Sequence, residues 1–347
     1  MKDCLLKLAA LSFAVSTTSM AQEDTDQKGL SLKSIFDLSV VTASRLEESA
    51  SKAPGTIYVI TDDQISLRGY RYLDEVLSDI PGFYVQNASD AVTYNRITVR
   101  GIKGNNKFVI LQNGIRISSP TAEDIPIAEN FPLYNVKQVE VVYGPASALY
   151  GADAFTGVIN LITKKAGEEH SQSVALGGGE NNNTFVNAYG NYRLSEKVDL
   201  SLGINHEMGD NGDLKEKYPD KYPNNNLDTF GGDTIIEAET RKDPHFPTTS
   251  RHMFANLNFA DALTLAFNRS DFSHPSVTGT RPDTANYNQT PQWRSIINSM
   301  YLKYSDSITE DIRTEVQFSF STYQISPESK FANIFTDYED GYEFAES

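Results

Sequence analysis

One stretch of sequence, residues 139–163, constrains the fold more than any other: VEVVYGPASALYGADAFTGVINLIT. Its first four residues, Val139–Val142, are apolar or β-branched around a single glutamate and predict a strand. Three glycines follow, at Gly144, Gly151 and Gly157. Glycine permits tight turns and close approach of two backbones. We therefore interpret the stretch as part of a compact domain and its glycines as structural rather than reactive.

The same texture of short apolar segments separated by turns extends over residues 37–165. A capping box formed by Thr61 and Gln64 predicts a short helix, and a helical pattern then runs over 72–77 until Pro81-Gly82 ends it. Asn113-Gly114 predicts a two-residue hairpin. Further strands are expected at 57–60, 83–86, 97–100 and 108–111. This part of the chain is thus expected to be a small α+β domain.

After residue 165, polar and apolar residues alternate, most clearly at 198–205, 253–259, 263–267 and 312–320. Alternation over about nine to eleven residues is typical of a strand in a membrane β-barrel. Short turns alternate along the chain with long polar connections. The short turns are at 194–197, near Asp261 and at 305–310, and the long connections are at 209–249, at 273–292 and after Ser326. A soluble β-sandwich would not need this order. We expect about seven antiparallel transmembrane strands in residues 166–347.

The N-terminus predicts export. Lys2 and Lys7 flank an n-region, Leu8 to Val15 is a short apolar stretch, and small residues precede Gln22. Residues 1–21 are therefore expected to be a signal peptide that is cleaved after Ala21. Residues 22–36 are polar and are expected to form a flexible periplasmic lead. The single cysteine, Cys4, lies inside the signal. Disulfides, thiolate metal sites and cysteine nucleophiles are therefore not expected in the mature protein.

Composition excludes several function classes. The formal net charge of −16 argues against a nucleic-acid partner. No run of eighteen apolar residues is present, which excludes helical membrane spans. The sequence has no nucleophile elbow, zinc-protease motif or phosphate-binding loop, so no catalytic residues are expected. Residues 37–165 lack His, Met and Cys, and the histidines further on have no ligand spacing, so no metal site and no cofactor are expected.

Seven residues after the lead form an extended, β-branched segment: Asp37, Leu38, Ser39, Val40, Val41, Thr42 and Ala43. A segment of this kind can add its backbone to the sheet edge of another protein. It resembles the TonB box of outer-membrane receptors, in particular the Asp-x-x-Val-Val-Thr-Ala arrangement of the cobalamin receptor. The blocks at 53–61, 73–82, 97–101, 109–114 and 139–163 resemble, in the same order, the plug domain of TonB-dependent outer-membrane receptors.

The resemblance implies an α+β plug domain (residues 44–165) followed by an antiparallel β-barrel. The barrel would be incomplete, with about seven strands of the 22 expected in such transporters. In the family, the arginine of the Val-Arg-Gly motif and a cation before the Gly-Pro pair contact acids of the barrel. Here Tyr143 replaces the second cation, and we expect Arg100 and Glu140 to make the plug–barrel contact.

The resemblance also implies that apical plug loops hold the ligand. Two loops, 87–95 and 118–130, offer donors, acceptors and an aromatic face, and the candidate ligand-binding residues are Ser89, Asp90, Tyr94, Ser118, Thr121 and Asp124. The box would bind TonB, which is driven by an inner-membrane complex, and the barrel would contact outer-membrane lipid.

The expected function is active uptake of a large scarce nutrient across the outer membrane of a Gram-negative bacterium. A ferric siderophore is the first candidate, and a cobalamin-like ligand is the second. A passive porin or adhesin remains the alternative, although neither needs a plug or a TonB box. Since residues 171–347 are too few for 22 strands, we also expect a gene fragment, a truncated product or one part of a split receptor, which by itself would not transport.

Overall fold

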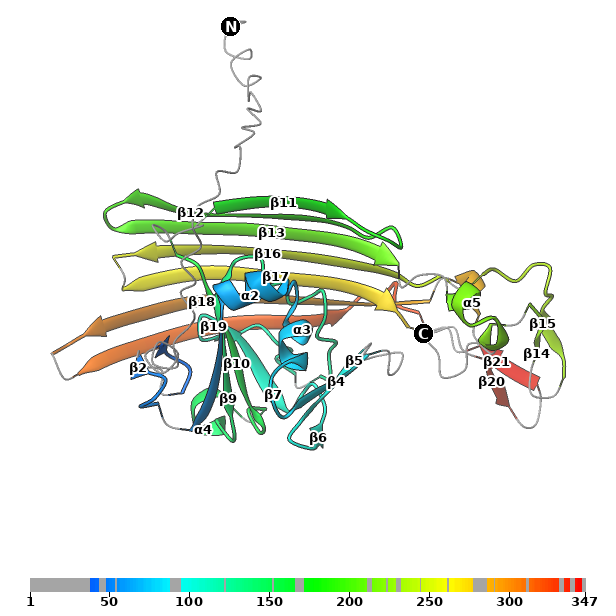
Figure 1. Cartoon of the computed structure of the whole chain (residues 1–347), viewed down its shortest axis with the longest axis horizontal. Helices are drawn as coiled ribbons and strands as arrows, with labels where there is room; N and C mark the ends of the chain where they lie inside the picture. Colours follow the sequence, from blue (N-terminus) through cyan, green and yellow to red (C-terminus); the bar gives the residue numbers. More distant parts are fainter. Residues whose placement is uncertain are drawn as a thin grey trace, which may run out of the picture.

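The computed structural model describes residues 38–43, 48–53, 55–87, 95–121, 123–151, 153–165, 172–210, 214–222, 224–228, 232–243, 245–260, 262–276, 286–289, 291–309, 312–330, 334–337 and 341–344. A long seven-stranded sheet, here called the wall, lies against a smaller α+β domain, the plug (Figure 1). The expected signal peptide and lead, together with Asp37, Ser89, Asp90 and Tyr94, lie outside the described residues.

The plug is built on a five-stranded sheet with the order β3-β9-β10-β7-β8. Strand β10 is parallel to β7 and antiparallel to β9. The strands are β3 (Thr56–Thr61), β7 (Phe108–Gln112), β8 (Ile115–Arg116), β9 (Val136–Tyr143) and β10 (Gly157–Thr163). A second sheet contains β4 (Phe83–Asn87), β5 (Asn95–Val99) and β6 (Ile102–Lys103). The helices are α2 (Asp62–Arg68), α3 (Leu73–Ser78) and α4 (Ser147–Tyr150).

Local sequence chemistry explains two of these elements. Helix α2 begins with the expected capping box, in which the Thr61 hydroxyl accepts from the Gln64 amide and the Gln64 side chain accepts from the Thr61 amide. The hairpin between β7 and β8 turns at Asn113 (φ 50°) and Gly114 (φ 82°). Asparagine and glycine tolerate positive φ, which a two-residue hairpin turn requires. Both predictions are confirmed.

The main hydrophobic core lies between the five-stranded sheet and helices α2 and α3. Val139 and Val141 of β9 and Ile159 of β10 are at most 1% exposed and belong to it. Ile297 of the wall joins the same cluster. The plug and the wall therefore share apolar contacts as well as polar ones.

The wall is an antiparallel meander with the order β11-β12-β13-β16-β17-β18-β19. Its strands are β11 (Gln172–Gly178), β12 (Thr184–Ser195), β13 (Val198–Asp210), β16 (Pro247–Phe259), β17 (Leu263–Pro275), β18 (Gln292–Ser307) and β19 (Arg313–Ile325). On β13, Leu202 and Ile204 are exposed on the face away from the plug, whereas Asn205 and Glu207 are buried toward it. The expected alternation and the seven strands are confirmed.

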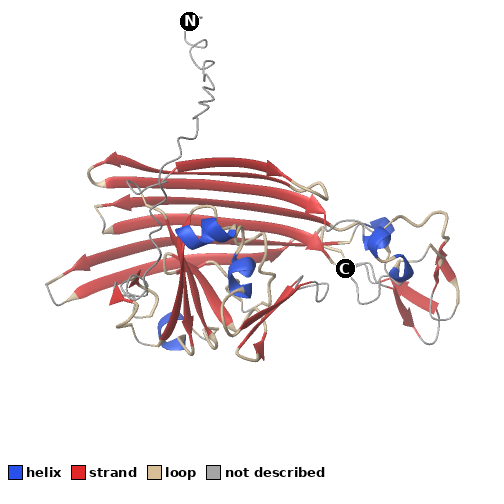
Figure 2. Ribbon diagram, viewed as in Figure 1, coloured by secondary structure: helices blue, strands red, loops and turns tan. Residues whose placement is uncertain are grey.

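The connections hold structure that the sequence pattern did not predict. The connection after β13 contains α5 (Leu214–Lys217), η1 (Pro219–Lys221), β14 (Leu227–Asp228) and β15 (Thr234–Ile236), and η3 (Tyr287–Gln289) precedes β18. Beyond β19, β20 (Ile334–Asp337) pairs with β21 (Gly341–Phe344). These elements are too short and polar to give a periodic signal. Strands dominate the molecule (Figure 2), and none of its described helices is long and apolar enough to cross a membrane.

Candidate functional site

The described part of the expected TonB box, residues 38–43, is here called the coupling segment. Strand β1 (Ser39–Val40) pairs with β2 (Glu48–Ser49) in a two-residue ladder. Val40 is completely buried and Thr42 is 1% exposed, whereas Val41 is 37% exposed. The segment is thus docked on the plug through alternate residues, as expected of an extended chain.

A single carboxylate holds the centre of the coupling segment. Oε2 of Glu140 accepts hydrogen bonds from the Val41 amide (3.1 Å) and the Thr42 amide (2.9 Å), and it also accepts from the Thr42 hydroxyl. Glu140 lies on β9 and is completely buried. Hydrogen bonds to an ionised acceptor are stronger than neutral ones. The carboxylate therefore replaces the strand partner that these two amides would otherwise need.

Three further plug side chains complete the dock. Asn160 donates through Nδ2 to the Thr42 hydroxyl oxygen (2.9 Å). Tyr150 donates its hydroxyl to the Thr42 carbonyl (2.9 Å). Gln138 donates to the Ser39 carbonyl (3.0 Å) and to Glu140 (2.7 Å). Ser39 and Val41 are thus held through backbone atoms alone, whereas Thr42 is held through its backbone and its hydroxyl.

The two residues that we expected to join plug and barrel are found inside the plug. Glu140 binds the coupling segment, as described above. Arg100 places its guanidinium 4.3 Å from the centroid of the Tyr143 ring, a cation–π contact. Burial raises the pKa of Tyr143, and its hydroxyl donates to the Pro81 carbonyl. Tyr143 thus stabilises the Arg100 side chain at the position where the family carries a second cation.

A cavity of about 450 Å³ lies beside the coupling segment, between the plug and the wall. Val41 lines one side of it. The rest of its lining is largely amide, hydroxyl and charged side chains, including Asn113, Asn160, Lys164, Ser201, Asn256, Asn258, Thr264, Lys303 and Gln317. The inner face of the wall is therefore polar where it approaches the coupling segment.

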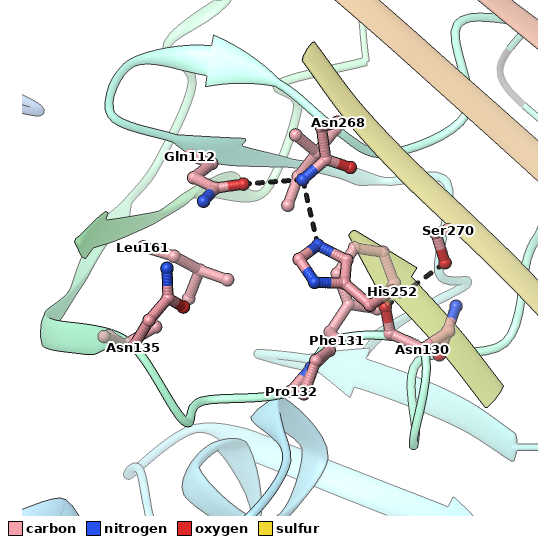
Figure 3. A pocket seen from close by; sticks show the side chains of 11 residues that line it. Gln112, Asn130, Phe131, Pro132, Asn135, Leu161, His252, Asn268 and Ser270 are labelled. Carbon is pink, nitrogen blue, oxygen red and sulfur yellow. Dashed lines mark hydrogen bonds between the residues drawn. The ribbon is translucent and has the colours of Figure 1, made fainter. Parts of the chain in front are cut away.

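A second, much smaller cavity of about 10 Å³ marks a polar seam between plug and wall (Figure 3). Nδ2 of Asn268, on β17, donates to Oε1 of Gln112 in the plug (2.7 Å) and contacts Nε2 of His252 on β16 (2.9 Å). The other ring nitrogen of His252 lies 3.3 Å from the Tyr134 hydroxyl. Because Asn268 donates to Nε2, the proton of a neutral His252 lies on Nδ1.

A third contact ties the plug to β13. Arg71 donates through Nη2 to Oε1 of Glu207 (2.9 Å), and the Tyr72 hydroxyl donates to Oε2 of the same carboxylate. The Arg71 guanidinium also lies 4.4 Å from the centroid of the Phe185 ring. Glu207 is only 3% exposed. It is a plug–barrel contact that the sequence analysis did not identify.

The three described ligand candidates differ in exposure. Ser118 is 7% exposed and its hydroxyl accepts from the Ile110 amide (3.3 Å). Asp124 accepts from the Asn105 amide (2.7 Å), so both residues support the loop. Thr121 is exposed next to Ser119. Among the described residues, no group of three or more His, Cys, Asp or Glu is arranged to hold a metal ion. The ligand assignment stays a prediction.

Sequence reasoning missed the roles of Glu140 and Glu207, although one signal was present. Glu140 is the only charged residue in the apolar run from Val139 to Tyr143. A buried carboxylate in a central strand needs hydrogen-bond donors. That need marks a site where a backbone or a cation docks, but it does not reveal which one.

Comparison with known proteins agrees with this architecture. Residues 49–158 match the model of the TonB-dependent Receptor Plug Domain. The iron-regulated outer membrane virulence protein of Vibrio cholerae is 31% identical over 198 residues, which are 52% of this chain and 29% of the relative. The vitamin B12 transporter BtuB of Vibrio vulnificus is 28% identical over 183 residues, 53% of this chain and 30% of the relative. The matched region spans less than a third of either relative.

Solved structures share the fold at lower identity. The ferric yersiniabactin uptake receptor FyuA of Yersinia pestis superposes with a TM-score of 0.56 at 16% identity, covering 82% of this chain and 43% of that one. A mutant of the ferric enterobactin receptor PfeA of Pseudomonas aeruginosa gives a TM-score of 0.58 at 20% identity, covering 79% and 42%. Residues 49–158 thus carry the plug domain of TonB-dependent receptors, and the wall has the fold of part of the barrels of these solved outer-membrane receptors.

Proposed function

We propose that this chain supplies the coupling segment, the plug and part of the barrel of a receptor that, with its barrel complete, takes up a large, scarce nutrient across the outer membrane, and that the coupling segment is where TonB binds. The observation that carries this proposal is the dock of Val41 and Thr42 on Glu140. Two amides of an extended chain are held by one side chain rather than by a neighbouring strand. A partner that offers a sheet edge can replace that side chain and pair with the same amides.

The proposed sequence of events has three steps and needs no covalent chemistry. Ligand binds the outer loops, the coupling segment leaves Glu140, and TonB pairs with it from the periplasm. Force on the segment then displaces or remodels the plug. The polar cavity beside Val41 supports this route, because a space lined by polar side chains of the wall lies next to the segment on which TonB would pull.

For the ligand we propose a ferric siderophore. The relative from V. cholerae is named for iron regulation, and the two structural neighbours above are named as receptors for ferric siderophores. A cobalamin-like ligand is the second candidate, because a vitamin B12 transporter is among the relatives of similar identity. Uptake of a radiolabelled ferric siderophore and of radiolabelled cobalamin, in cells that lack their own receptors, separates the two.

The coupling step is tested with Val41→Pro. Proline removes the amide that a sheet edge needs, so uptake should fall to the level seen after an uncoupler collapses the proton-motive force. Val41→Ala keeps the amide and is the matched control, with uptake close to that of the unchanged protein. Uptake that survives both Val41→Pro and the uncoupler would instead favour a passive pore.

A further inference from the structure

The contact between Arg71 and Glu207 belongs to a larger group of ionisable side chains. Arg71, Tyr72 and Glu129 of the plug interact with Glu207 of β13, Glu75 bonds the Arg71 and Tyr72 amides, and Asp74 lies beside Glu75 and Glu129. These six residues are here called the Glu207 cluster. The cluster thus holds four carboxyls and one guanidinium, and that guanidinium pairs with Glu207. Like charges in a buried interface repel one another strongly, because little water screens them.

Two of the four carboxyls are well satisfied. Glu75 accepts from the amides of Arg71 (2.5 Å) and Tyr72 (3.2 Å), which holds the start of α3. Glu207 accepts from the Arg71 guanidinium and the Tyr72 hydroxyl. Burial raises the pKa of Tyr72, and its hydrogen bond to Glu207 raises it further, so the phenol keeps the proton that it donates.

The other two carboxyls, those of Glu129 and Asp74, each have an oxygen atom without a hydrogen-bond partner among the described residues. These atoms, Oε2 of Glu129 and Oδ1 of Asp74, are buried. A buried, unpaired carboxylate oxygen costs free energy that a protonated carboxyl avoids. Burial, followed by the neighbouring Asp74 and Glu207 charges, raises the pKa of Glu129 to about 7. Burial and the Glu75 charge do the same for Asp74, again to about 7.

The backbone around Glu129 is also fastened to the wall. The Ser250 hydroxyl of β16 donates to the Glu129 carbonyl (2.7 Å), and the Ser270 hydroxyl of β17 donates to the Asn130 carbonyl (3.3 Å). His252 of β16 is a titratable side chain that also faces this part of the plug, where its ring contacts the Tyr134 hydroxyl. The cluster therefore lies in the plug–wall interface itself, where a change of charge acts on docking.

We propose that the Glu207 cluster is a proton-dependent clamp: it holds the plug against β13 while Glu129 and Asp74 retain a proton, and it loosens when that proton is lost. The sign follows from linkage. A carboxyl whose pKa is raised in the docked state favours docking at low pH, and this contribution is lost as the pH rises through about 7. The proposal does not depend on which nutrient the protein binds.

The experiment measures docking as a distance. Nitroxide labels are attached to two cysteines, introduced by Lys103→Cys in the plug and by Lys197→Cys in the turn before β13. Both lysines are exposed, and Cys4→Ser removes the native cysteine. Double electron–electron resonance then gives the populations of docked and displaced plug. The protein is held in detergent with enough urea to displace about a tenth of the plug at pH 6. Between pH 6 and pH 8 the ratio of displaced to docked plug should rise about tenfold for each proton released.

The variant Asp74→Asn/Glu129→Gln removes both titrating carboxyls at nearly constant shape, so its ratio should change less than twofold. Asp79→Asn is the matched control, because Asp79 is an exposed carboxylate just after α3 that pairs with Arg68 (2.7 Å) outside the cluster. It should keep the full pH response of the parent protein. If the double variant does not assemble, Glu129→Gln alone should still weaken the response. An unchanged ratio in the parent protein, or a full response in the carboxamide variants, overturns the clamp.

Discussion

Asn160 lies directly opposite Glu140 in the register of β10 and β9, and both side chains end on Thr42. The Thr42 hydroxyl donates to Glu140 and accepts from Asn160, so one side chain of the coupling segment closes a three-residue hydrogen-bond chain. Such a chain is buried, and each member depends on the others. The dock is consequently a cooperative unit rather than a sum of separate contacts.

This unit predicts how the coupling segment responds to substitution. Glu140→Gln and Thr42→Val should each free the segment by about 1–3 kcal/mol, because each leaves a buried polar group without its partner. In a double-mutant cycle the two effects should not add, with an interaction energy of about 1 kcal/mol or more. The measurement is the mobile fraction of a nitroxide at Ser39→Cys. Additive effects would show that Thr42 and Glu140 act independently.

These two variants also refine the uptake test. Neither removes the Val41 amide, so both should leave TonB pairing intact while Val41→Pro abolishes it. Loss of uptake in all three variants would mean that the docked geometry, and not the backbone amide, is what the coupling step needs.

The seam in Figure 3 gives a prediction about plug docking. Asn268→Leu removes the donor shared by Gln112 and His252. Leaving these two buried acceptors unpaired should lower the free energy of unfolding by about 2 kcal/mol. Denaturant titration in detergent, followed by the fluorescence of the single tryptophan, Trp293, measures the change.

The control for the seam is Asn298→Leu. Asn298 is next to Ile297, which packs into the plug core, so its own side chain is on the other face of β18. The Asn298 side chain hydrogen-bonds to Arg269 and Thr322, which both belong to the wall. The variant should lower the free energy of unfolding by clearly less than Asn268→Leu, because the two hydrogen bonds that it removes are only partly buried. An equal loss in both asparagine variants would argue against a role for the seam in docking.

The outward face of the wall predicts a membrane-facing surface. Leu202 is 43% exposed on that face, and arginine there should cost about 2–4 kcal/mol near the bilayer centre. Leu202→Arg should therefore reduce the folded protein recovered from outer membranes, as measured by heat-modifiable electrophoretic mobility. Asn256→Lys places a charge in the polar cavity instead and should assemble normally. Equal recovery of both variants would count against lipid contact at Leu202.

Several features could be predicted from residues that are close together in the chain. The capping box at Thr61, the Asn113-Gly114 hairpin and the alternation along β13 each depend on neighbours within a few positions, so the local pattern contains the whole signal. The order of the motifs in residues 37–165 similarly identified the plug. The short elements between β13 and β16 escaped prediction, because two- to four-residue elements have no period to detect.

The sequence by itself determined the kind of elements in the plug, the position of the coupling segment and the apolar face of β13, β16, β17 and β19. Only the tertiary structure decided what the buried charges do. Thr42 lies 98 residues from Glu140, and Tyr72 lies 135 residues from Glu207. A carboxylate within an apolar strand predicts that hydrogen-bond donors lie nearby. Which donors these are depends on how the sheets pack. For that reason Glu140 was expected at the barrel and is found on the coupling segment, while Glu207 holds the plug.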